Sequence, residues 1–159
     1  MFRHAIAAAA LLLPTLAAAG FDEAIAAYSA GRYDDALKEF HQLAEQGDAQ
    51  SLYFIGLFNH NGFGVKKDDA EAAKWFKRAA MKNNALAQYY MGSLTERGNG
   101  VDKDPVAAYM WYSLSVKNSA NERDAAYTQK EVKRLEKKLT PEQVAKAKEM
   151  IAAFKPDNG

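Results

Sequence analysis

Residues 49–84 and 85–120 are two copies of one 36-residue unit that follow each other directly. Seven positions of the first copy carry the same residue 36 positions later. They are Gly56, Gly62, Gly64, Val65, Asp68, Ala72 and Trp75, matched by Gly92, Gly98, Gly100, Val101, Asp104, Ala108 and Trp111. A repeat of this length is one supersecondary unit that cannot bury its apolar face alone, so copies have to stack. Stacked helical repeats build extended binding surfaces rather than single catalytic pockets.

The first 19 residues have the pattern of a secretory signal peptide. Arg3 and His4 precede an apolar run at 5–13, and three alanines at 17–19 supply the small residues that a signal peptidase needs. The run is too short to span a bilayer as a helix. We therefore predict cleavage after Ala19, a periplasmic or secreted location and no stable membrane insertion afterwards. The alternative is an uncleaved anchor or a buried N-terminal helix.

The chain contains no cysteine, which excludes disulfides, thiolate metal sites and a cysteine nucleophile. An exported protein without disulfides is compatible with the periplasm, where such bridges are allowed but not required. Residues 20–65 carry seven acids and two bases, whereas residues 66–159 carry 18 bases and 13 acids. This mild asymmetry is typical of solvated surface and lacks the clustered basic face of a nucleic-acid binder. We predict no nucleic-acid partner.

Each copy is predicted to be a pair of helices joined by a glycine loop. In the second copy, residues 85–94 combine good helix formers with apolar side chains at helical spacing. Gly98 and Gly100 then end the helix, and Asp104 with Pro105 opens the next one as N-cap and first helical residue. In the first copy the cap of the second helix is Asp68 or Asp69.

Gly56 and Gly92 lie inside predicted helices, where glycine costs about 1 kcal/mol relative to alanine. A glycine at this position in both copies predicts close helix–helix contact that leaves room for Trp75 or Trp111. Val101, the lone apolar residue of the loop in the second copy, is expected to reach back into the core.

A third, shorter copy at about 21–48 precedes the other two, with Ala36 and Phe40 placed 36 residues before Ala72 and Phe76. Residues 121–154 read as two closing helices, the second begun by Thr140 with a capping box. The predicted fold is an all-α right-handed solenoid of about eight helices. It forms a single domain, residues 20–159, in which the last helix pair caps the stack.

The two copies resemble the Sel1-like repeat, a tetratricopeptide relative with a longer, glycine-bearing loop between its helices. The resemblance covers roughly residues 21–120 and rests on the seven shared positions and on the string from Ala87 to Gly92. It implies an α-solenoid with adaptor or scaffold roles. Some exported relatives carry a disulfide in each repeat. This chain has no cysteine, so an activity of that subgroup is not carried across.

No catalytic or metal-binding constellation stands out. His41 and His60 lack the spacing of a metal motif, and the neighbouring carboxylates at 22–23, 34–35 and 68–69 fall at predicted helix starts, where capping explains them. The Gly-x-Gly loops have no Gly-Lys-Ser/Thr sequence, no preceding strand and no βαβ context, so they read as turns rather than phosphate loops. We predict a protein that is not an enzyme and binds no cofactor and no metal.

The concave face remains as the candidate site. Alignment on the interior glycine places one row of side chains from each copy on this face: Gln50, Tyr53, Leu57 and His60, then Leu86, Tyr89, Ser93 and Glu96. Such a mixture of aromatic, apolar and polar groups suits a peptide or a helix. Ordinary half-exposed helix residues would give the same row.

The predicted function is a protein–protein interaction module, a monomeric periplasmic adaptor or regulator that binds a peptide segment of a partner. Two alternatives stay open: a protein that binds or modifies peptidoglycan or another carbohydrate of the cell wall, and a structural subunit that stacks on itself through the ends of its repeats.

Overall fold

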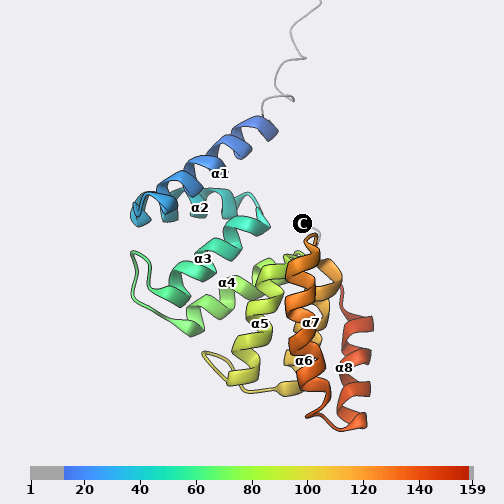
Figure 1. Cartoon of the computed structure of the whole chain (residues 1–159). Coiled ribbons are helices and arrows are strands. Elements are labelled where there is room, and N and C mark those ends of the chain that lie inside the picture. The colour runs from blue at the N-terminus through green and yellow to red at the C-terminus, as the bar shows by residue number, and fades with distance from the viewer. Residues whose placement is uncertain (1–12, 158–159) are drawn as a thin grey trace, which may run out of the picture.

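The computed structural model describes residues 13–157, and all of their regular structure is helical (Figure 1). The eight helices are α1 (Leu13–Ser29), α2 (Tyr33–Glu45), α3 (Ala49–Asn61), α4 (Asp69–Met81), α5 (Ala85–Arg97), α6 (Pro105–Asn118), α7 (Glu122–Glu136) and α8 (Pro141–Ala153). Within this range the prediction of an all-α stack of about eight helices is confirmed. The residues before 13, including the basic start of the predicted signal peptide, lie outside the described part.

The chain forms three consecutive helix pairs, α1 with α2, α3 with α4 and α5 with α6, each packed on the next. Side-chain caps define the ends of these helices. Asp68 caps α4 by accepting a hydrogen bond from the Glu71 amide, and Asp104 caps α6 in the same way. Thr140 and Gln143 form the predicted capping box of α8. Capping by side chains satisfies amides that a helix start leaves without partners.

The interior glycines make the predicted close contacts, but with a different partner. A Cβ added to Gly56 would lie 2.6 Å from the Phe76 ring, and one on Gly92 would lie 2.7 Å from the Tyr112 ring. The expectation of Trp75 or Trp111 is therefore wrong by one residue, about 100° of helix rotation.

Trp75 instead lies half-buried beside His41 of α2, with 5.3 Å between the ring centres, and its indole N–H donates to the Glu71 carboxylate at 2.9 Å. The Arg78 guanidinium lies 4.6 Å from the centre of its ring. Trp111 is buried and packs edge-on against Phe154, with 5.9 Å between the ring centres. The two equivalent tryptophans thus differ in burial.

The glycine loops join neighbouring repeats. Gly64 has φ +66° and packs against Tyr33 and Asp34 at the start of α2, while Gly100 has φ +70° and packs against the backbone of Asp69 at the start of α4. Val101 is half-buried against the main core, as expected, and Val65 of the first copy is half-buried there too. Each loop therefore uses the first turn of a helix in the preceding pair as its docking surface.

The C-terminal helices close the stack by packing on α6 (Figure 1). A second core forms there from α6, Val132 and Leu135 of α7 and Ala147 of α8. The segment after α8 returns to the middle of the chain, where the Asp157 amide donates to the Met81 carbonyl oxygen at 2.7 Å. None of the described helices combines the length and apolar character needed to cross a bilayer.

Candidate functional site

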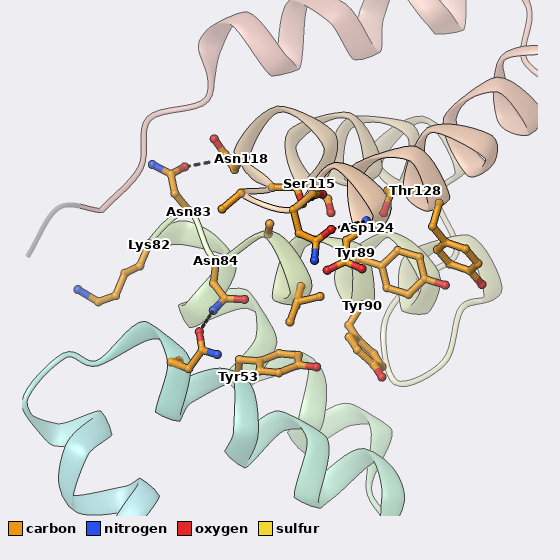
Figure 2. Close-up of a pocket in the computed structure, with 17 residues that line it drawn as sticks. Tyr53, Lys82, Asn83, Asn84, Tyr89, Tyr90, Ser115, Asn118, Asp124 and Thr128 are labelled. Carbon is orange, nitrogen blue, oxygen red and sulfur yellow. Dashed lines mark hydrogen bonds between the residues drawn. The ribbon is translucent and has the colours of Figure 1, made fainter. Parts of the chain in front are cut away.

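A hollow of about 580 Å³ lies where α3, α5 and α7 meet, next to the C-terminal end of α6 (Figure 2). We call it the main hollow. It is lined by the first turns of α3, α5 and α7, by the α4–α5 turn and by the α6–α7 turn. Because the repeats stack, residues from 50 to 128 converge on this one place.

The described part of the chain exposes two large hydrophobic side chains, and both line the main hollow. Leu86 of α5 is 39% exposed and Tyr127 of α7 is 57% exposed. A single exposed apolar side chain is ordinary on a protein surface, but two within one concavity form a small apolar patch. Such a patch in a concave site favours binding.

Tyrosines form one side of the main hollow (Figure 2). The Tyr89 ring lies 5.9 Å from the Tyr127 ring and 5.7 Å from the Tyr90 ring, which in turn lies 5.9 Å from the Tyr53 ring. Burial, followed by a hydrogen bond with the Tyr127 hydroxyl, raises the pKa of Tyr89 to about 12. Burial also raises the pKa of Tyr53. Both phenols are therefore neutral at physiological pH.

Amide side chains occupy the other side. Asn84 caps α5 with its Oδ1 and donates its Nδ2 weakly to Gln50 at 3.4 Å, while Asn121 caps α7. The Asn118 Nδ2 donates to the Asn83 Oδ1 at 3.2 Å (Figure 2). The Asp124 carboxylate also faces this space. The site thus combines aromatic faces with neutral hydrogen-bonding groups.

A second hollow of about 510 Å³, which we call the side hollow, lies between α1 and the start of α3. Phe21 and Leu43 supply its apolar lining, and Asp22 and Asp48 its charge. Gln50 borders both hollows. The concave face is therefore indented from α1 to α7.

The structure brings four of the eight residues singled out from the sequence to the main hollow: Gln50, Tyr53, Leu86 and Tyr89. The remaining four lie outside it. Leu57 is half-buried against the main core. His60 Nδ1 lies 2.6 Å from Asp69 Oδ1, and its ring lies 5.7 Å from the Tyr90 ring.

Glu96 and Ser93 lie under α7. The Arg134 guanidinium donates two hydrogen bonds to the Glu96 carboxylate, at 2.7 and 2.6 Å, and it also pairs with Glu131 at 2.6 Å. The Arg134 hydrogen bonds lower the pKa of Glu96. Ser93 is half-buried, one turn before Glu96, whose carboxylate also accepts a hydrogen bond from the Tyr112 hydroxyl at 3.4 Å. These contacts hold α7 over the later residues of the predicted row on α5. The first turn of α5 stays uncovered.

Sequence reasoning missed the lining residues of the α4–α5 turn, of the end of α6 and of α7: Asn83, Asn118, Asn121, Asp124 and Tyr127. One signal for them was available. Where the short copy at 21–48 ends in Gly47 and Asp48, the copy at 49–84 ends in Asn83 and Asn84. The contribution of α7 carries no such signal, because α7 belongs to neither 36-residue copy.

The described residues include no group of three or more His, Asp or Glu side chains arranged to hold a metal ion. The chemistry that the main hollow offers is apolar contact and neutral hydrogen bonding, which suits reversible binding.

The stacked helix pairs and the concave hollow together define an α-solenoid repeat protein. Residues 49–84 and 85–119 match the family model of the Sel1 repeat. The chain therefore contains two consecutive Sel1 repeats. Proteins of this type generally act as scaffolds for interactions between proteins, and the repeat is typically non-catalytic.

Two solved structures are similar to this chain. One is c5321, described as a protective antigen present in uropathogenic Escherichia coli strains displaying an SLR fold, with 26% identity and a TM-score of 0.78 over 87% of this chain. The other is a Sel1 repeat protein from Oxalobacter formigenes, with 27% identity and a TM-score of 0.65 over 72% of this chain. These matches confirm the predicted right-handed solenoid class.

This chain spans 29% of the c5321 chain and 45% of the Oxalobacter formigenes chain. Both neighbours are therefore more than twice as long as the part they share with it. A search among curated proteins found no match.

Proposed function

We propose that this chain is an exported interaction module, a periplasmic adaptor or regulator that holds a peptide segment of a protein partner in the main hollow. The mature protein begins at Gly20, forms one domain to residue 159 and acts as a monomer. The binding residues are Gln50, Tyr53, Leu86 and Tyr89 from the two repeats, joined by Tyr127 of α7.

The observation that carries this proposal is the pair of exposed apolar side chains in the main hollow. Leu86 and Tyr127 leave apolar surface in water at one concave place, next to aromatic rings and hydrogen-bonding amides. Burial of apolar area against a partner is favourable by about 25 cal/mol per Å². A peptide side chain placed between them would bury both.

The side hollow supports an extended ligand rather than a compact one. Because Gln50 borders both hollows, a chain that leaves the main hollow past Gln50 enters the side hollow beside Phe21. An extended strand advances about 3.3 Å per residue, so several residues would lie along this path.

Export is supported by the pattern of residues 1–19. Phe21, two residues after the proposed cleavage point, already packs edge-on against Phe40 and Phe54, with ring centres 5.9 Å apart in both contacts. Cleavage after Ala19 would therefore leave these packing residues on the mature chain. Mass spectrometry of the exported protein tests this, because intact mature protein has to begin at Gly20.

A binding experiment tests the function. Partners are captured by crosslinking with the mature protein in a periplasmic extract, and overlapping peptides that cover the captured partner are measured by fluorescence anisotropy. The Leu86→Ala/Tyr127→Ala double variant should bind the best peptide at least about tenfold more weakly, since each truncation removes more than about 1 kcal/mol of apolar contact. The matched control is Lys130→Ala/Lys133→Ala, two exposed positions of α7 away from the hollow.

Equal affinity of the folded double variant would refute the main hollow as the site. Pelleting of the protein with purified cell-wall material, without any peptide binding, would favour the carbohydrate alternative. Concentration-dependent assembly in sedimentation velocity would contradict the monomer and favour self-stacking.

A further inference from the structure

Several positions around the main hollow carry asparagine, whereas the equivalent turn position or helix cap elsewhere in the chain carries glycine or aspartate. Asn83 has φ 62°, which makes it the one non-glycine residue of the described chain in the left-handed region. The equivalent position 36 residues earlier is Gly47, with φ +86°. Glycine adopts this conformation without strain, whereas any L side chain adds a cost. The asparagine at 83 is therefore not explained by the backbone alone.

The helix caps show the same preference. The caps of α5 and α7, Asn84 and Asn121, line the main hollow, whereas the caps Asp48, Asp68, Asp104 and Thr140 do not, although the helix that Asp48 caps, α3, reaches the hollow. Aspartate caps a helix as well as asparagine does, and its charge also complements the helix dipole. What asparagine adds is an uncharged amide group with two donor hydrogens.

A buried network holds one of these amides in place. Gln88 is fully buried, donates from Nε2 to the Ala80 carbonyl oxygen at 3.0 Å and accepts at Oε1 from the Asn118 Nδ2, also at 3.0 Å. The same Asn118 Nδ2 donates to the Asn83 Oδ1 (Figure 2). Buried polar groups that satisfy each other form a stiff unit, so the Asn83 side chain is anchored from beneath.

These bonds leave donors unused. The Nδ2 groups of Asn83 and Asn121 and the Nε2 of Gln50 have no hydrogen-bond partner among the described residues, because each of these side chains uses only its oxygen. All three residues line the main hollow. The hollow is thus rich in neutral donors, and its two charged lining residues, Lys82 and Asp124, carry opposite signs, so the lining has no net charge that would select a charged ligand. Such a surface fits a chain that carries uncharged hydrogen-bond acceptors at regular intervals. An extended polypeptide carries them as its main-chain carbonyl groups.

We infer that the main hollow recognises its peptide through the main chain: Asn83, Asn121 and Gln50 donate to carbonyl oxygens of an extended segment, while one apolar side chain of that segment packs between Leu86 and Tyr127. This inference rests on the proposed function and specifies its ligand. The preference for sequence is then limited to the apolar anchor, and segments with different polar residues around that anchor bind alike.

The test uses an array of short synthetic peptides with varied sequences around one central apolar residue, followed by anisotropy measurements on the strongest binders. Replacement of polar side chains by alanine should change affinity less than about twofold. Replacement of single carbonyls by thiocarbonyls, which are weaker acceptors, should lower it about fivefold or more at two or three positions.

Two protein variants remove donors without disturbing the fold. Asn83→Gly keeps the left-handed backbone, and Asn121→Ser keeps the cap, because serine caps helices about as well as asparagine. Serine retains a single hydroxyl donor on a shorter side chain, so Asn121→Ser removes the outward amide donors of Asn121. Each should lower peptide affinity about tenfold, the effect of one lost interface hydrogen bond. Asn99→Ser, in an exposed loop away from the hollow, is the matched control and should bind like the wild type.

The outcomes separate the two claims. If no peptide on the array binds the wild-type protein, the proposed function fails. If peptides bind and Leu86→Ala/Tyr127→Ala weakens them, but Asn83→Gly and Asn121→Ser bind like the wild type, the main-chain inference alone is overturned. Dependence of affinity on particular polar side chains, with no thiocarbonyl effect, would overturn it as well.

Discussion

The two 36-residue copies share a framework and differ in the row that faces the hollows. Interior glycines receive an aromatic ring in both copies, from Phe76 in one and Tyr112 in the other. At the concave positions, by contrast, Gln50 corresponds to Leu86 and His60 to Glu96. The interior glycines face the same kind of surroundings in each copy, whereas these two concave positions face different neighbours, so their residues differ.

The His60 and Glu96 positions illustrate the difference. His60 contacts Asp69 at the start of the helix that follows in its own unit. Glu96 contacts Arg134 of α7, an element that belongs to no repeat. The same position therefore joins two helices of one repeat in the first copy and fastens the closing helix in the second.

The loop glycines offer the largest test of the shared framework. A Cβ on Gly100 would lie 2.5 Å from the Asp69 carbonyl oxygen and would overlap neighbouring backbone atoms, whereas a Cβ on Gly31 would meet nothing within 4 Å. Both residues have positive φ, of +70° and +72°. Gly100→Ala should therefore lower the free energy of unfolding by about 4 kcal/mol or more, and Gly31→Ala by only about 1–2 kcal/mol.

Urea denaturation of the two variants gives these values. Similar losses for both would mean that the loop does not press on the preceding repeat and that φ alone sets the cost. Gly64→Ala should fall between them, because its Cβ would meet the Tyr33 side chain at 2.9 Å.

The equivalent tyrosines of the concave row should respond unequally. Tyr53 is 7% exposed and packs on Phe54 and Phe76, whereas Tyr89 is half-buried beside the exposed Tyr127. Tyr53→Ala should cost about 3 kcal/mol of unfolding free energy through a cavity, and Tyr89→Ala about 1 kcal/mol. Thermal unfolding followed by circular dichroism measures both.

Each tyrosine has a matched control in its Tyr→Phe variant, which keeps the ring and should retain most of the stability. A larger loss at Tyr89 than at Tyr53 would contradict this order. The unequal burial also makes Tyr53→Ala a poor probe of binding, because lost affinity would be confounded with lost stability.

The smallest expected effect concerns the fastening of α7. In the folded protein, hydrogen bonds from Arg134 lower the pKa of Glu96. The stability that the ionised Glu96 side chain contributes is therefore present above the pKa of the unfolded chain, and it is lost as the pH falls through the lower pKa of the folded protein. At pH 7 the free energy of unfolding of the wild type should exceed that of Glu96→Gln by about 1 kcal/mol. The difference is small because the ion pair is partly exposed. The difference should shrink progressively as pH falls below about 4.5, the ordinary value for this carboxyl.

Urea titrations at several pH values give this difference. In the Arg134→Met background, Glu96→Gln should have almost no effect at any pH, because the charge partner is gone. A pH-independent difference between wild type and Glu96→Gln would contradict the assignment of the effect to this ion pair.

Much of the fold could be predicted, because residues close in the sequence specify where each helix begins and ends. Asp104 with Pro105, the Thr140 capping box and the loop glycines act within one turn of the chain, so the residues themselves specify the helix ends. The close helix–helix contact at Gly56 was predicted, but the residue that makes this contact was not. Whether Trp75 or Phe76 fills the space depends on the rotation of α4 against α3, which a repeat pattern does not encode.

The candidate site could be predicted only in part. Gln50, Tyr53, Leu86 and Tyr89 follow from their place in the repeat, and all four line the main hollow. Tyr127 and Asn118 did not follow, because the path of the chain after the last repeat sets where they lie. The sequence by itself determined the helix pairs, their stacking and the shared glycine contacts, since these depend on residues close in the chain or repeated along it. Only the tertiary structure decided which part of the concave face stays open, because α7, held by Arg134 on Glu96, covers one part and borders the rest.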